Sequence, residues 1–326
     1  MDPAADAGIT CLPIPTPFGI GDVNTYLLDG DPLTLVDCGP NSASAFLALE
    51  QQLAALGRRV EDIELVLITH QHIDHMGLAH LLAARGAEIA CLDLLAPVLE
   101  DWERHAIQDD DDALLLMNRH GVEDHVADAL RAMADVVRGW GAGCRVDRRL
   151  ADGELLALGH RELRVAHRPG HSPSDTLFID DERGIVIGGD HLIAGVSSNA
   201  LMARPLDGWD GRRPPTLLSY RESLRATRAD APALVLGGHR EPVTDAVALI
   251  DQRLAAHERR AESFYDKLAA GPRTAHELAS ETWGQTAFTQ VFLTLSEVLG
   301  HLDLLIHEGR VREDRSEHII RFERAG

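Results

Sequence analysis

The sequence has few cysteines and no motif that pairs them. Its four cysteines are widely spaced over 326 residues, and none belongs to a CxxC pair; they are Cys11, Cys38, Cys91 and Cys144. A disulfide-stapled scaffold is excluded, because such scaffolds need a high density of cysteine. We therefore expect reduced thiols and a cytoplasmic protein.

Long apolar runs and basic clusters are absent as well. No run of about 18 apolar residues is present, so we expect no membrane-spanning helix. The N-terminal segment MDPAADAGITCLPIP lacks the basic start and apolar centre of a secretory signal. With 31 Lys and Arg against 52 Asp and Glu, the formal net charge is −21. This balance argues against nucleic acid as a partner, since binding a phosphate backbone needs clustered cations.

Strands and helices alternate along most of the chain, which predicts an α/β fold in layers. Residues 23–37 have the pattern of a hairpin, the helix expected over 42–56 stops at Gly57, and residues 64–70 form a short apolar run typical of a buried strand. A helix is expected over 215–228. Further strands are expected over 154–158, 163–167, 176–180, 185–189 and 233–237.

The chain is predicted to divide into a main domain over 1–242, a linking helix over 243–270 and a small domain over 271–326. Within the main domain, residues 94–140 are helical and charge-rich, and we interpret them as an insertion. The acidic run 109–112 is expected to be a solvated helix start or a loop. The order helix, helix, hairpin in the small domain is that of a winged helix.

Four metal-capable side chains follow the strand expected over 64–70. His70, His72, Asp74 and His75 lie within six residues. They can converge, because side chains alternate along an extended segment while the start of a helix turns the last two inward. We estimate that chance would produce such a pattern less than about 0.01 times in this chain. Four solvated surface groups are a poorer interpretation, since the strand buries the turn.

Three later residues each follow an expected strand beside glycine. They are His171 in HRPGHSPSD, Asp190 in VIGGDH and His239 in LVLGGHREP. Glycine allows the backbone to approach closely, and strand ends commonly carry functional residues. Five histidines and two aspartates suit two divalent cations such as zinc, while iron or manganese remain open.

These residues resemble the metallo-β-lactamase superfamily, whose HxHxDH motif corresponds here to residues 70–75. The resemblance covers roughly residues 10–242 and implies the αββα sandwich fold. It also implies the ligand sets: His70, His72 and His171 for one metal, Asp74, His75 and His239 for the other, and Asp190 bridging both.

Asp37, in VDCG, matches an early strand-end aspartate of the same family. We interpret Asp37 as a residue that orients a ligand histidine or the ligand turn. A plain turn-capping role is the alternative.

The tail resembles the C-terminal winged-helix domain of a glyoxalase II-like, β-lactamase-like subgroup of hydrolases. The stretch EVLGHLDLLIHEGRV carries this likeness. The helix expected over 292–309 contains Glu297, Asp303 and Glu308 but no Lys or Arg, which is a poor match to a DNA groove. Packing or homodimer formation is the expected role.

Hydrolysis is the chemistry that such a site predicts. Two cations lower the pKa of a shared water and polarise the oxygen under attack. Asp74 is expected to be catalytic, orienting the hydroxide and moving its proton. A small-molecule substrate with an ester bond, above all a thioester, is favoured. A nuclease on the same metals, a mononuclear-iron oxygenase and a non-catalytic regulator are the alternatives, although relatives that are oxygenases use fewer ligands.

The substrate pocket is predicted from position alone. The insertion over 94–140 is expected to cap the site. Ser197, Ser198 and Asn199 follow Asp190 in the chain and are expected to line the pocket, and Arg204 is a candidate for an anionic part of the substrate.

Overall fold

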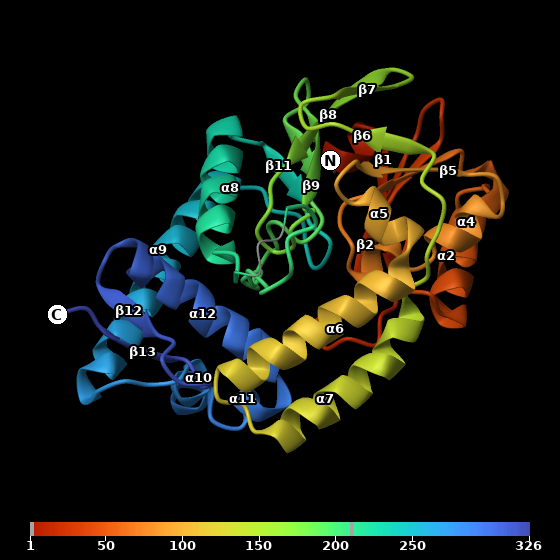
Figure 1. Cartoon of the computed structure of the whole chain (residues 1–326). Coiled ribbons are helices and arrows are strands. Elements are labelled where there is room, and N and C mark those ends of the chain that lie inside the picture. Colours follow the sequence, from red (N-terminus) through yellow and green to blue (C-terminus); the bar gives the residue numbers. More distant parts are fainter. Residues whose placement is uncertain (1–2, 209–211) are drawn as a thin grey trace.

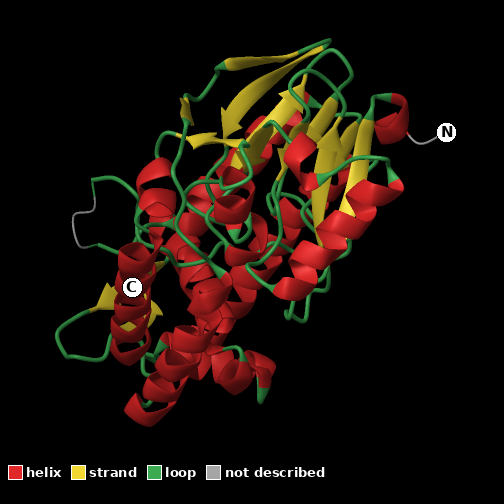
Figure 2. Ribbon diagram, turned by 90° about the vertical axis from the view of Figure 1, so that its right-hand side faces the viewer, coloured by secondary structure: helices red, strands yellow, loops and turns green. Residues whose placement is uncertain are grey.

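Two β-sheets form the centre of one half of the molecule, and helices make up most of the other half (Figures 1 and 2). The structure is a computed structural model that describes residues 3–208 and 212–326. The first sheet has the spatial order β1 (Ile9–Ile14), β2 (Val23–Leu28), β3 (Thr34–Val36), β4 (Leu65–Ile68), β5 (Glu88–Leu92) and β6 (Arg148–Leu150). The second sheet has the order β11 (Leu234–Leu236), β10 (Ile185–Ile187), β9 (Thr176–Asp180), β8 (Arg161–His167) and β7 (Leu155–Leu158).

The direction of the strands changes within each sheet. In the first sheet β1, β2 and β3 are antiparallel, with Leu27 opposite Leu35, and β3 to β6 are parallel, with Leu35 opposite Val66. In the second sheet β10 and β11 are parallel, and the other neighbouring pairs of these strands are antiparallel. The metal-capable residues follow the carboxyl ends of β4, β10 and β11, which have parallel neighbours, and of β8, whose neighbours are antiparallel, while Asp37 follows β3.

The alternation of side chains in the second sheet separates two cores. Phe178 of β9 packs into the core between the sheets, whereas its neighbours Leu177 and Ile179 pack outward. The outward residues meet Tyr220 and Leu224 of helix α8 (Thr216–Asp230). Apolar residues on both faces are what a fully covered sheet requires. The mixed α/β sandwich predicted from the sequence is therefore confirmed.

Helices flank the first sheet and form the insertion. The N-terminal part contains α1 (Pro3–Asp6), α2 (Ala43–Ala55), α3 (Ile73–Met76) and α4 (Ala79–Ala83). The insertion contains α5 (Ala96–Glu100), α6 (Trp102–Arg119) and α7 (Asp124–Val137). Single 3₁₀ turns occur at Val60–Asp62, Arg138–Trp140 and Leu268–Ala270.

The C-terminal region begins with the long helix α9 (Ala246–Lys267). It continues with α10 (Ala275–Trp283), α11 (Thr286–Thr289), α12 (Val291–His307) and a hairpin of β12 (Val311–Asp314) and β13 (Arg321–Arg324). Thr274 and Glu277 form a capping box at the start of α10. The order helix, helix, hairpin is present, with α11 as an additional single turn.

The insertion and the C-terminal region share one apolar core. Met117, Val122 and Ala127 of the insertion belong to the same buried cluster as Leu295 and Phe322. Backbone hydrogen bonds add to this contact, from the amide of Ile320 to the carbonyl of Arg119 and from the amide of His276 to the carbonyl of His120. The division into domains at residues 242 and 270 stays a prediction.

The acidic run was predicted incorrectly. Asp109–Asp112 lies in the middle of α6 rather than at a helix start or in a loop. Asp110 pairs with Arg138 and Asp111 with Arg131 of α7, so the run holds the two insertion helices together. These arginines, distant from the run in sequence, offset the repulsion among its four carboxylates.

The remaining sequence-level expectations concern thiols and the membrane. None of the four cysteines forms a disulfide, and Cys11 is exposed whereas the other three are buried. Among the described residues, none of the helices is both long and apolar enough to cross a bilayer.

We predict that acid weakens the packing of α9 against α12. His257 of α9 is buried against the rings of Tyr220 and His301, and its Nδ1 has no hydrogen-bond partner among the described residues. Burial lowers the pKa of His257 to about 3, so the unfolded chain binds more protons below pH 6.5. Stability should fall as the pH drops from 6.5, by at most about 1.4 kcal/mol per pH unit for this group.

Urea unfolding at pH 7, 6 and 5 tests this expectation. The variant His257→Leu should show a shallower loss of unfolding free energy than the wild type. His125→Leu, which removes an exposed histidine of α7, should keep the wild-type slope. Equal slopes for the wild type and His257→Leu would contradict the assignment.

Candidate metal centre

The HxHxDH segment lies in the turn between β4 and α3. The buried strand β4 ends at Ile68, and the short helix α3 begins at Ile73 with His72 as its N-cap residue. Asp74 and His75 belong to α3 and are buried. Strand, turn and helix therefore bring the four side chains of the motif together over six residues.

The imidazoles of His70, His72 and His171 form a first group of converging side chains. His72 Nδ1 lies 3.0 Å from His70 Nε2 and 2.9 Å from His171 Nε2. His70 and His171 each use the other ring nitrogen elsewhere: His70 Nδ1 lies 2.9 Å from the Thr69 hydroxyl, and His171 Nδ1 donates to the Asn199 carbonyl at 3.1 Å. The Nε2 atoms of His70 and His171 therefore carry lone pairs, and both face Nδ1 of His72. A proton on this Nδ1 could form a hydrogen bond with only one of them.

Asp74, His75 and His239 form a second group, next to Asp190. His239 Nε2 is 3.4 Å from Asp74 Oδ2, and His75 Nε2 is 3.4 Å from Asp190 Oδ1. The other oxygen of Asp190, Oδ2, lies 3.6 Å from Nε2 of both His171 and His239. Asp190 thus lies between the two groups, and its carboxylate faces a histidine from each.

Asp37 holds His75 and the residue that precedes the motif, Thr69, through hydrogen bonds. It follows β3 with a φ of 57°, in the left-handed region. One carboxylate oxygen accepts from the Thr69 amide, and the other accepts from the Thr69 hydroxyl and from His75 Nδ1 at 2.7 Å. Because the Thr69 hydroxyl donates to Asp37, it accepts from His70. One carboxylate therefore sets the proton position on His75 directly and on His70 through Thr69.

The charges of the cluster hold each other in place. Burial disfavours the charged form of His75, but the carboxylates of Asp190, Asp37 and Asp74 raise the pKa of His75 well above its usual value. Burial alone would raise the pKa of Asp190, yet His75 and then His171 hold it far below the normal range of a carboxyl. In the metal-free protein, a proton on His75 offsets part of the negative charge.

The donor atoms fit divalent metal ions. Each of three sets offers ligand atoms that all lie within 4.8 Å of one another: His70, His72 and His171; His70, His75 and Asp190; and Asp74, His75 and His239. His75 Nε2 and Asp190 Oδ1 are buried and have no hydrogen-bond partner in the described part of the chain. Buried polar atoms normally find partners, so these two are available for coordination. Imidazole with carboxylate suits zinc, iron or manganese.

Two residues that the sequence analysis did not assign to the site support the loop before His239. The Tyr26 hydroxyl donates to the Gly237 carbonyl at 2.6 Å, and the side chain of Asn24 donates to the same carbonyl at 3.1 Å. His239 Nδ1 in turn donates to the Asp22 carbonyl at 2.7 Å. A tyrosine in a strand that is buried throughout needs a partner for its hydroxyl, which was the available signal.

The residues predicted to line the pocket have differing surroundings. Ser197 is exposed, whereas Ser198 is buried beside Tyr220. Asn199 contacts His171 through its backbone carbonyl. Arg204 Nε lies 3.6 Å from Asp109 Oδ1 and 3.8 Å from Asp112 Oδ2. The guanidinium of Arg204 is therefore paired with carboxylates of α6.

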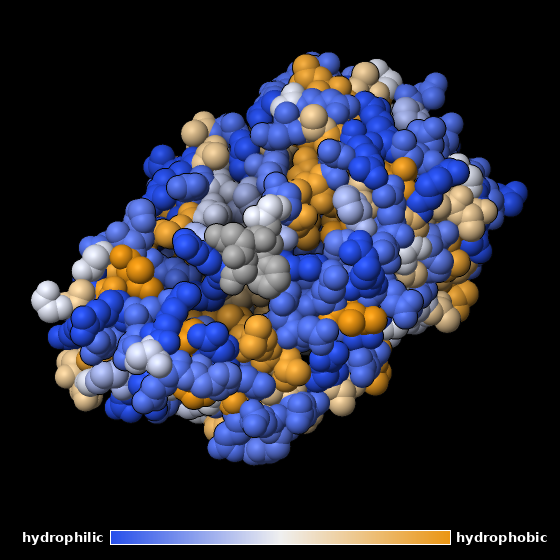
Figure 3. Space-filling view, viewed as in Figure 1, coloured by the Kyte–Doolittle hydropathy of each residue, from blue (hydrophilic) through white to orange (hydrophobic). Residues whose placement is uncertain are grey.

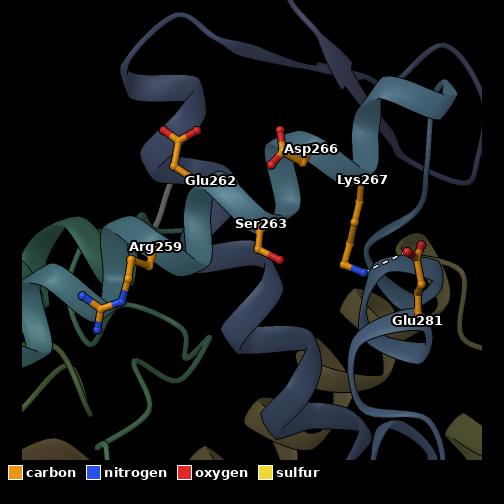
Figure 4. A pocket seen from close by; sticks show the side chains of 6 residues that line it. All are labelled: Arg259, Glu262, Ser263, Asp266, Lys267 and Glu281. Carbon is orange, nitrogen blue, oxygen red and sulfur yellow. Dashed lines mark hydrogen bonds and ion pairs between the residues drawn. The ribbon is translucent and has the colours of Figure 1, made fainter.

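One surface hollow is lined by residues of α9 and α10 and includes none of the clustered histidines (Figure 4). Its Lys267 pairs with Glu281 at 2.8 Å, and Arg259 and two further carboxylates, of Glu262 and Asp266, complete its charged lining. This hollow offers no chemistry comparable to the buried cluster.

The fold and the cluster define a metal-binding α/β sandwich, and comparison with known proteins identifies the family. Residues 18–239 match the protein family described as "Metallo-beta-lactamase superfamily". The chain is 33% identical over 304 residues to "Probable metallo-hydrolase YqjP" of Bacillus subtilis (strain 168), covering 91% of this chain and 92% of that protein. This chain therefore belongs to the metallo-β-lactamase superfamily.

Two crystal structures are similar over almost the whole chain. One is a metallo-beta-lactamase family protein from Thermus thermophilus, with a TM-score of 0.80, 28% identity and coverage of 97% of this chain and 98% of that one. The other is a beta-lactamase domain protein from Burkholderia ambifaria, with a TM-score of 0.81, 26% identity and coverage of 98% and 91%. Both similarities extend beyond the matched family region into the C-terminal part.

We predict that Gly238→Ala impairs metal binding. A Cβ at residue 238 would clash with Asp190 Oδ1 and lie 2.6 Å from His75 Cε1, closer than real contacts allow. Both side chains would have to move, and metal affinity should fall at least about tenfold.

Metal content after dialysis against a weak chelator measures the effect. Gly188→Ala is the matched control, because its new Cβ would meet nothing among the described residues closer than Val235 Cγ1 at 3.5 Å. If Gly238→Ala retained as much metal as Gly188→Ala, the position assigned to Asp190 would be wrong.

Proposed function

We propose that this protein is a dinuclear metal-dependent hydrolase that acts on a small ester, with a thioester as the favoured substrate. The observation that carries the proposal is the convergence of seven side chains around His75 Nε2 and Asp190 Oδ1, two buried atoms that lie 3.4 Å apart and make no hydrogen bond in the described chain. The relative from Bacillus subtilis, named a probable metallo-hydrolase, supports the same class.

The two metals have distinct ligand sets in this proposal. His70, His72 and His171 would hold one ion, and their Nε2, Nδ1 and Nε2 atoms respectively face one another. Asp74, His75 and His239 would hold the second ion, and Asp190, which faces a histidine of each group, would serve both. Zinc is the favoured metal because imidazole dominates the donor set, with iron or manganese as alternatives.

When bound, the two cations would supply water activated at neutral pH and polarise the oxygen of the bond to be cleaved. The residues of the chain then orient and move protons. Burial alone would raise the pKa of Asp74, but the charge of His75 and the adjacent imidazole of His239 hold it below its usual value, so Asp74 is ionised at neutral pH. Its carboxylate can orient the attacking water and accept its proton. Asp37 keeps His75 and His70 in the tautomers that present Nε2.

The choice of a small acyl substrate rests on charge and on the C-terminal region. The net charge of −21 disfavours a polyanionic substrate. We propose that the C-terminal region is winged-helix-like and serves packing rather than nucleic-acid binding. Leu295, Val298 and Leu302 of α12 are fully buried, and only Leu293 and His307 of this helix are exposed, so it presents little surface to a groove. Four cysteines that form no disulfide are compatible with work in the cytoplasm.

A substrate panel combined with metal analysis tests the proposal. Protein loaded with zinc should hydrolyse a small thioester faster than a lactone and far faster than a phosphodiester. Asp190→Ala should lose metal and turnover together, and Asp74→Asn should lower kcat by about 10² or more. Asp128→Asn, an exposed residue of α7, serves as the control and should behave as the wild type.

Two results would reject parts of this proposal. Full turnover by metal-stripped protein would exclude the mechanism. A preference for the phosphodiester would assign the same metals to a nuclease or phosphodiesterase.

A further inference from the structure

Asn199 connects a candidate metal ligand to the C-terminal region. Its backbone carbonyl accepts a hydrogen bond from His171 Nδ1 at 3.1 Å. Its side-chain Nδ2 donates to the carbonyl of Leu293, in the first turn of α12, at 2.8 Å. The same residue therefore touches the metal cluster with its backbone and the C-terminal region with its side chain.

The loop that carries Asn199 has little structure of its own. Residues 197–205 form neither helix nor strand. A second hydrogen bond to α12 holds the loop, because the Met202 amide donates to the hydroxyl of the fully buried Ser296 at 3.1 Å. Neighbouring residues are held from other helices, since the Thr216 hydroxyl of α8 donates to the Ala200 carbonyl at 3.2 Å and Arg253 of α9 donates to the Val196 carbonyl at 2.8 Å. The side chain of Asn199 itself is held by α12, which lies between α9 and α6 (Figure 1).

The other candidate ligands with a placed second nitrogen rely on a different part of the chain. His70 uses Thr69, His75 uses Asp37 and His239 uses the Asp22 carbonyl. Each of these partners lies within residues 18–239, the region that matches the family. For His171, the acceptor also belongs to that region, but a hydrogen bond to α12 fixes its place.

We propose that α12 positions the metal ligand His171 through Asn199, so that the C-terminal region sets the affinity of one metal and not of the other. This inference rests on the proposed dinuclear site. A donated Nδ1–H fixes both the proton position and the ring direction of a ligand histidine, and loss of such a partner weakens metal binding about 10- to 100-fold. Asn199 is a positioning residue and takes no part in the chemistry.

Both hydrogen bonds of this contact form within one chain. The bond from Met202 to Ser296 is buried, whereas the bond from Asn199 to Leu293 lies at the surface, beside the exposed side chain of Leu293. Figure 3 shows that the face of the molecule turned to the viewer is largely hydrophilic, with scattered hydrophobic areas. The link joins two segments of the same chain and needs no partner molecule.

Titration of the metal-free full-length chain with Co²⁺ tests the proposal. Calorimetry and visible absorption should show two bound equivalents in the wild type. In Asn199→Asp, which removes the amide donor without changing the shape, affinity for one equivalent should fall about 10- to 100-fold while the other stays unchanged. Ser296→Ala should weaken the same equivalent by removing the second contact with the loop.

A matched control separates this effect from general damage. Asn41 also donates its side-chain amide to a backbone carbonyl, that of Gly139, but contacts no ligand histidine in the described chain. Asn41→Asp should therefore bind both equivalents as the wild type does, and the thermal midpoint of each metal-free variant shows whether folding is intact.

The possible failures are distinguishable. A wild type that binds fewer than two equivalents would overturn the proposed dinuclear function. Two wild-type equivalents that are both unaffected, or both equally weakened, in Asn199→Asp would overturn only the role assigned to α12.

Discussion

The structure depends on the mutual neutralisation of buried groups that follow the carboxyl ends of strands from both sheets. Five imidazoles and two carboxylates are packed where water is largely excluded, and their nitrogen and oxygen atoms face one another. Isolated charges in such a place are costly unless they are paired or coordinate a cation. The sandwich supplies the rigid strand ends, and the glycines beside Asp190 and His239 provide the space that the cluster needs.

Hydrogen-bond partners fix the orientation and the tautomer of the histidines in this cluster. Asp37 acts on two histidines, and backbone carbonyls act on two more, so four ring protons have defined positions. The lone pairs that remain all point inward. A set of histidines without these partners could rotate or exchange tautomers, and its affinity for metal would be lower.

The sequence was most informative where the signal was contiguous. The strand over 64–70 and the HxHxDH motif lie side by side in the chain, so their arrangement could be inferred from the geometry of a strand followed by a helix. The general α/β architecture followed from the alternation of apolar segments, and the family membership from the motif.

Other features could not be predicted from a local sequence pattern. The strand β1 contains Pro13 and lies at the sheet edge, where proline is tolerated but its sequence signal is weak. The short strand β5 lies between helical patterns and was missed for the same lack of contrast. The contacts of Arg204 with α6 and of Asn199 with α12 join residues more than 90 positions apart, and no local pattern encodes them.

The core shared by the insertion and the C-terminal region constrains how this architecture can change. Met117 and Val122 come from between two strands of the first sheet, Phe322 comes from the end of the chain, and they exclude water from one another. A recombination event that replaced the tail alone would leave the tip of the insertion without its apolar contacts. The two segments are therefore expected to be inherited as a pair, despite the roughly 200 residues that separate them in the sequence.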